Sequence, residues 1–200
     1  MGSGSSKFDK IVLQAPKGGV KHFPVSENYV RNQVTELTIK SKLFSQKVSI
    51  FDNSDGKEVF VVHTWGAYKI FTPDEKFLGL SCIDKGLIFT KRFMRFEEND
   101  KTLVYATIDY HHQTLNVFLH TPHVESEKGI KTSDLQPDVV VKLYGNPDSF
   151  DVLCGDPKNH PYKIATCRNH KLQVAADVDL RFVVLLAIYS EHVFIQMDTQ

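Results

Sequence analysis

Residues 178–194 read VDLRFVVLLAIYSEHVF, and this stretch decides the fold. Eight apolar residues follow one another from Phe182 to Tyr189. A run of this length favours a helix over a strand, whereas the β-branched Val183, Val184 and Ile188 favour a strand weakly. We therefore expect a C-terminal helix that is apolar on nearly every face.

Such a helix must be enclosed by protein or by lipid. Its apolar run falls well short of the roughly 20 residues that a bilayer span requires, so enclosure by protein is expected. Asp177 or Asp179 can cap the helix start, since a carboxylate accepts the free backbone N–H groups there.

Upstream of the helix, from residue 34, apolar and polar residues alternate in short runs. Leu37 and Ile39 belong to the first run and Val48 and Ile50 to the second, and residues 52–56 (DNSDG) form a turn. Later runs are Glu58–His63, Ala67–Thr72, Phe77–Ile83, Leu87–Phe93, Thr102–Ile108, Thr114–His120, Val139–Tyr144, Ser149–Cys154, Tyr162–Thr166 and Lys171–Ala175. Short strands at this spacing predict an all-β sandwich or barrel. Because no second layer of helices is expected to cover the apolar helix, a closed barrel around that helix is the better prediction.

Charge divides the chain into two parts. The net charge is zero, but residues 1–50 hold eight Lys or Arg against three acids, so they carry +5 and the remainder −5. We interpret residues 1–33 as a flexible basic arm, of which one stretch could dock, and residues 34–200 as the barrel domain. A basic segment can favour an anionic surface, although a solvated arm explains the charge equally well.

The first seven residues read MGSGSSK, which matches the acceptor pattern for N-myristoylation at Gly2. One acyl chain binds membranes only marginally, and nearby lysines could supply the second signal. The alternative is an expression-vector linker, which residues 2–6 (GSGSS) also resemble. The sequence leaves these two interpretations open.

Residues 37–62 and 177–188 resemble the opening repeats and the C-terminal helix of LURP-one-related proteins. The matching stretches are LTIKSKLFS (37–45), VSIFD (48–52), VFVV (59–62) and DVDLRFVVLLAI (177–188). That family is similar in fold to the tubby C-terminal domain and to phospholipid scramblases. The resemblance implies an antiparallel barrel of about twelve strands around a central helix, and a membrane-associated binding domain.

The candidate ligand-binding residues are cations placed on predicted strands. Residues 91–95 (KRFMR) put Lys91 and Arg95 on one face of a strand and Arg92 on the other. Lys40 and Lys42 share a face of another strand. Pairs of such cations could hold a lipid phosphate, although solvated strand charges are the commoner meaning of such clusters.

Other classes of function find little support in the sequence. No catalytic motif is present, and no cofactor is expected. The histidines and cysteines lack zinc-site spacing, and a DNA- or RNA-binding domain would need a basic net charge. Three cysteines without a paired motif and the lack of a secretory signal predict a cytoplasmic protein, peripheral to the plasma membrane if acylated.

We therefore expect a non-enzymatic domain that binds a membrane surface or a phosphoinositide. Two alternatives stay open. One is a protein-interaction module that presents the loop Thr121–Pro137 to an unidentified partner, and the other is a scramblase-like lipid transporter.

Overall fold

The computed structural model describes residues 11–16, 27–41, 45–88, 91–98, 101–109, 112–119, 136–146, 148–155 and 161–198. These residues form twelve strands and one long helix. The strands are β1 (Thr35–Ser41), β2 (Lys47–Asp52), β3 (Glu58–His63), β4 (Ala67–Phe71), β5 (Phe77–Ile88), β6 (Lys91–Glu98), β7 (Lys101–Asp109), β8 (Thr114–Leu119), β9 (Val139–Leu143), β10 (Phe150–Cys154), β11 (Tyr162–Arg168) and β12 (Lys171–Val174). A short 3₁₀ helix, η2 (Glu27–Tyr29), precedes them and the α-helix α1 (Leu180–Asp198) follows.

Each strand pairs antiparallel with its neighbour in sequence, and the first strand also pairs with the last. Leu37 of β1 lies opposite Asp52 of β2 on one side and opposite Leu172 of β12 on the other. The strand order therefore closes on itself into a barrel. The predicted mainly-β class with a C-terminal helix is confirmed.

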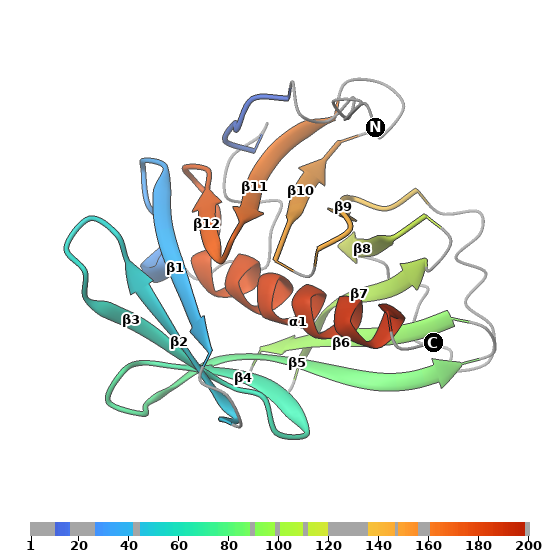
Figure 1. The fold of residues 1–200 in the computed structure, drawn as a ribbon, viewed down its shortest axis with the longest axis horizontal. Coiled ribbons are helices and arrows are strands. Elements are labelled where there is room, and N and C mark those ends of the chain that lie inside the picture. Colours follow the sequence, from blue (N-terminus) through green and yellow to red (C-terminus); the bar gives the residue numbers. More distant parts are fainter. Residues whose placement is uncertain are drawn as a thin grey trace.

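Helix α1 lies inside the ring of strands (Figure 1). Every residue from Leu180 to Ser190 is at most 4% exposed, because the barrel wall covers all sides of the helix. Asp179 caps the helix as expected, since its carboxylate accepts the backbone N–H of Arg181 at 2.9 Å. Among the described residues, no helix is both long and apolar enough to cross a membrane.

A buried ion pair closes the end of the barrel at which α1 begins. The Arg181 guanidinium donates to Asp179 at 2.7 Å and to the carbonyl of Leu78 at 2.7 Å, and it lies 4.6 Å from the ring centroid of Tyr29. Val30 forms a β-bridge with Asp179. Residues just before β1 therefore cover this end of the barrel.

A second part of the segment before β1 also contacts the wall. Leu13 forms a parallel bridge with Lys163 of β11, and the Gln14 N–H donates to the Lys163 carbonyl at 2.7 Å. The last paired residues of β11 and β12 are Ala165 and Val174, and the contacts with Leu13 and Gln14 lie beyond that pair. Residues 11–16 thus use backbone groups of β11 that β12 is too short to reach.

Two of the predicted strand boundaries are wrong. We expected one strand to end at Ile83 and the next to cover Leu87–Phe93, but β5 runs on to Ile88 and β6 begins at Lys91. The pairing register shifts between Asp84 and Gly86. Residues 84–86, which we left between two separate strands, accommodate a bulge within one long strand.

The two ends of the barrel carry different turns. Helix α1 begins near Leu78, the second residue of β5, and its far half packs beside Tyr68 of β4, whose ring lies 5.3 Å from that of Tyr189. We call the end at which this second half lies the helix-exit end. The β1–β2, β3–β4, β5–β6 and β11–β12 turns lie at this end, because the strands alternate in direction.

Candidate functional site

The outer wall of β2, β1, β12 and β11 carries one row of residues in register. Thr38 of β1 lies opposite Phe51 on one side and opposite Lys171 on the other, and Lys171 lies opposite Arg168. Side chains alternate between faces along a strand, and Leu172 is buried in the core. The row that contains Lys171 therefore points away from the core.

Three cations gather in and beside this row. Lys40 lies on the same face as Thr38, two residues further along β1, and its ammonium lies 4.4 Å from the Phe51 ring centroid. Lys40 and Lys171 are both exposed, and neither forms an ion pair with any other residue that the structure describes. We call Lys40, Lys171 and Arg168 the basic row.

Arg168 is held in place by its own set of acceptors. Its guanidinium donates to the carbonyls of Phe150 and Cys167, both at 2.7 Å, and to the Asp151 carboxylate at 3.0 Å. It also lies 4.9 Å from the ring centroid of Tyr144. Most of its donors are already used, so Arg168 contributes fixed positive charge and leaves little capacity for a new bidentate contact.

Asp151 is a buried counter-charge that lies beside the row, on the outer face of the wall. It is 0% exposed and accepts from Tyr144 at 2.9 Å and Thr166 at 2.7 Å, and the Lys163 ammonium lies 2.9 Å away. Burial raises its pKa, but the hydrogen bonds with Lys163 and Thr166 and the nearby positive charges outweigh burial and hold the pKa below its ordinary value. Asp151 therefore stays ionised and is the shared counter-charge of Lys163 and Arg168.

A second row, which contains the Glu36 carboxylate, runs parallel to the basic row. Gln173 of β12 donates to the Glu36 carboxylate of β1 at 2.7 Å, and on its other side it lies opposite Thr166 of β11. A surface groove of about 440 Å³ lies over the two rows. It is lined by Glu36, Asn53, Thr166, Arg168, Asn169, Lys171, Leu172 and Gln173. Amide, hydroxyl and cationic groups, together with the Glu36 carboxylate, thus face one hollow in the wall.

The two predicted groups of cations lie on strands that are not neighbours. Lys40 lies in the basic row, whereas Lys42 and the acylation candidate Gly2 lie outside the described residues. Lys91, Arg92 and Arg95 all lie on β6, and strands β2 to β5 separate β6 from β1. Lys91 pairs with Ile88 at the helix-exit end, and Arg95 pairs with Ile83 further along the barrel. The backbone therefore does not place these three residues beside Lys40.

The sequence contained a signal for the two cations that we missed. Residues 168–171 read RNHK, and Asn169 and His170 form a two-residue hairpin turn with φ values of 51° and 61°. Positive φ at both turn positions is typical of a type I′ turn, and Asn is one of the residues that tolerate it. Such a turn places the two flanking residues, Arg168 and Lys171, directly opposite each other.

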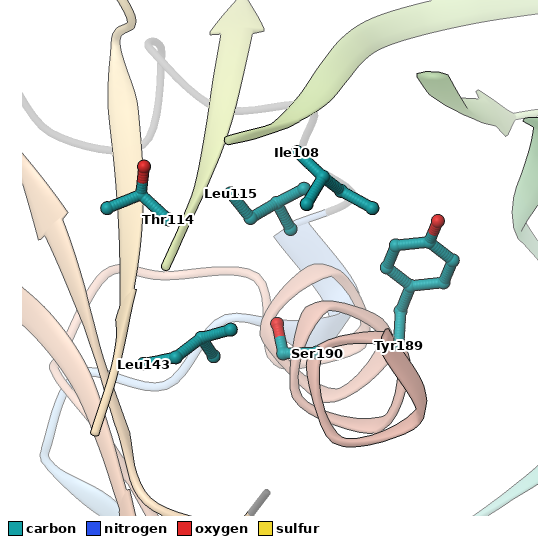
Figure 2. A pocket seen from close by; sticks show the side chains of 6 residues that line it. All are labelled: Ile108, Thr114, Leu115, Leu143, Tyr189 and Ser190. Carbon is teal, nitrogen blue, oxygen red and sulfur yellow. The ribbon is translucent and has the colours of Figure 1, made fainter. Parts of the chain in front are cut away.

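A small cavity lies between the wall and α1 near the helix-exit end. Its lining consists of Ile108, Thr114, Leu115, Leu143, Tyr189 and Ser190 (Figure 2). Ser190 is 2% exposed, and its hydroxyl has no hydrogen-bond partner among the residues that the structure describes. The volume is about 10 Å³, which is room for one water at most, so this cavity cannot hold an organic ligand.

The described histidines, cysteines and acids form no group of three or more that could hold a metal ion. Cys82, Cys154 and Cys167 are buried, and they form no disulfide with one another. Burial raises the pKa of Cys167 to about 12, which keeps this thiol protonated at neutral pH. The loop Thr121–Pro137, proposed above as a partner-binding segment, lies outside the described residues up to residue 135.

The structure is an antiparallel barrel that encloses its C-terminal helix. This is the architecture that the resemblance to LURP-one-related and tubby-like proteins implies. The chain is similar in structure to the Arabidopsis thaliana protein AT5G01750, known from an X-ray structure, with a TM-score of 0.62 and 16% sequence identity. The match covers 86% of this chain and 98% of that chain. It supports a LURP-one/tubby-like fold, and at this identity it carries the fold alone. No protein-family model and no curated protein matches the chain.

Proposed function

We propose that this chain is a non-enzymatic domain that binds an anionic membrane surface through the basic row. The observation that carries this proposal is the position of Lys171, directly opposite Arg168 on the outer wall. Like charges opposite each other destabilise a sheet. Asp151 offsets the charge of Arg168, but no described carboxylate pairs with Lys171. An anionic ligand would supply the missing counter-charge.

The groove beside the row favours a head group that carries hydroxyls as well as phosphate. Lys171 and Lys40 are available to donate to phosphate oxygens, and each lysine near an anionic surface contributes on the order of 1 kcal/mol. The amides of Asn169 and Gln173 could bind ring hydroxyls. A phosphoinositide offers both kinds of group, so it is the lipid we propose.

Attachment in cells would use the N-terminus as a second contact. An acyl chain on Gly2 binds only reversibly, and it would add to the contribution of the basic row. We propose that the protein is cytoplasmic and that the acylated form is peripheral at the plasma membrane. Intact mass of protein made in a eukaryotic host checks the acylation: the myristoyl increment is expected on the unaltered chain and must be missing after Gly2→Ala.

Vesicle co-sedimentation tests the barrel separately, with chain made in bacteria and therefore without acylation. Its arms are phosphatidylcholine alone, phosphatidylcholine with phosphatidylserine, and phosphatidylcholine with a phosphoinositide. Binding to both anionic arms that weakens with added salt is expected, with the phosphoinositide bound more tightly. A soluble inositol phosphate should compete if the head group is the ligand. The proposal is overturned if the chain binds neither the phosphatidylserine vesicles nor the phosphoinositide vesicles.

A further inference from the structure

Trp65 is the only tryptophan of the chain, and it lies exposed at the helix-exit end of the barrel. It occupies the tight turn between β3 and β4 and is 74% exposed. Gly66 follows with φ of 69°, and the Ala67 N–H donates back to the Trp65 carbonyl at 2.7 Å. The backbone of the turn is therefore fixed while the indole points into solvent.

Hydrogen bonds tie this turn to the neighbouring β1–β2 turn. The Thr64 N–H and hydroxyl both donate to the Gln46 carbonyl, at 2.8 and 3.2 Å. Lys40 lies one residue before the end of β1, where the chain enters that β1–β2 turn. Trp65 and the Lys40 end of the basic row thus lie at the same end of the barrel, with one hairpin turn between them.

We propose that Trp65 is a membrane-interface anchor: its indole enters the boundary between head groups and acyl chains when the basic row binds an anionic bilayer. This inference rests on the proposed function and adds a residue and a docking orientation to it. Indole has an apolar body and one N–H donor, and tryptophan is enriched at the interfaces of membranes for that reason. The barrel would approach the bilayer with its helix-exit end.

Two observations favour a bilayer over a protein as the occupant. The exposed cations Lys40 and Lys171 match the negative charge of a lipid surface. A stable protein interface would need a contiguous patch of roughly 800 Å² on each partner. The described residues offer no such apolar patch here, since the other exposed large hydrophobic residues are Val12, Val34 and Phe77. Phe77 begins β5 and lies at the opposite end of the barrel.

Intrinsic fluorescence tests this inference directly, because Trp65 is the only tryptophan that can report. The full chain is titrated with phosphatidylcholine vesicles that contain phosphatidylserine, and then with the same vesicles made from lipids brominated near the head of the acyl chain. A blue shift on binding and quenching by the brominated lipid are expected. Trp65→Ala should weaken binding about tenfold, as expected when one large apolar side chain is partly buried.

A relocated reporter provides the matched control. In the double variant Trp65→Phe with Phe77→Trp, the single tryptophan lies at the opposite end of the barrel. Its emission should not shift on the same vesicles. An unshifted Trp65 emission on vesicles that co-sediment with the chain would overturn the anchor and leave the proposed function standing. Absence of co-sedimentation would overturn both.

Discussion

Arg168 and Lys171 lie directly opposite each other across the β11–β12 hairpin, and both side chains lie on the outer wall. The hairpin turn has only two residues, so the two positive charges cannot separate along the strands. Asp151, which lies on the same outer face, offsets one of them: its carboxylate lies 3.0 Å from the Arg168 guanidinium. The stability of the wall therefore depends on this carboxylate, whereas Lys171 has no described carboxylate as a partner.

Replacing Asp151 by Asn should destabilise the fold by about 3 kcal/mol, because Lys163 would stay buried without its counter-charge. Equilibrium urea unfolding at neutral pH measures this loss. Asp55→Asn serves as the control, because the Asp55 carboxylate is exposed and lies 3.3 Å from the ammonium of Lys57. It also accepts the Lys57 backbone N–H at 3.0 Å, which the amide oxygen of Asn can still do. We expect that control to change stability by less than about 0.5 kcal/mol.

The effect of Asp151→Asn should depend on pH. The pKa of Asp151 is lowered in the folded state, so its contribution is fully present above the unfolded value of about 3.9 and is lost as the pH falls through the folded value. The stability difference between the unaltered chain and the variant should therefore shrink as the pH is lowered from about 6 towards about 2. The unfolding free energies of both proteins across this range check the prediction. A difference that stays constant with pH would contradict the role given to the ionised carboxylate.

Truncating the middle of the enclosed helix should cost more than truncating a surface residue of the same kind. Leu185 is 0% exposed, and Leu185→Ala should destabilise the fold by about 3 kcal/mol because it leaves a cavity. Leu185→Asp should prevent folding, since it would bury an unpaired charge in an apolar core. Val34→Ala, at a position that is 51% exposed, is the control and should change stability little. A loss below about 1 kcal/mol for Leu185→Ala in urea unfolding would mean that the helix does not fill the barrel.

Ser190→Ala should leave the protein as stable or make it more stable, by up to about 1 kcal/mol. The substitution removes a buried hydroxyl that has no partner among the described residues, and it improves helix propensity. Ser54→Ala provides the contrast, because the Ser54 hydroxyl donates to Asp52 at 2.7 Å and its loss should destabilise. Thermal unfolding of the two variants compares the signs. A marked loss of stability in Ser190→Ala would show that the hydroxyl makes a stabilising contact.

The enclosed helix was predictable because its signal is local. An uninterrupted apolar run that is too short for a bilayer must be buried in protein, and Asp179 marks its start. Most strands were predictable for the same reason, since alternation and turn residues lie within a few positions of each other. The β5–β6 boundary was not, because Asp84 to Gly86 can form either a turn or a bulge and only the pairing with β6 decides between them.

The basic row depends on contacts between distant parts of the chain. Lys40 stood out in the sequence, but its nearness to Lys171 arises from the pairing of β1 with β12, the first strand with the last. Nothing near Lys40 in the sequence indicates that closure. The density of charge in residues 91–95 was a poorer guide, since four strands separate β6 from β1.

The central claim is that binding to an anionic membrane depends on where the positive charge lies and not on the net charge of the chain. Vesicle binding by two matched charge-reversal variants tests this claim most directly. Lys171→Glu and Lys57→Glu change the net charge equally, but Lys57 lies in the β2–β3 turn at the opposite end of the barrel. On vesicles that contain phosphatidylserine, Lys171→Glu should lose affinity about thirtyfold, from two charge units at roughly 1 kcal/mol each, and Lys57→Glu should lose little. Equal losses in the two variants, or no loss in Lys171→Glu, would contradict the account.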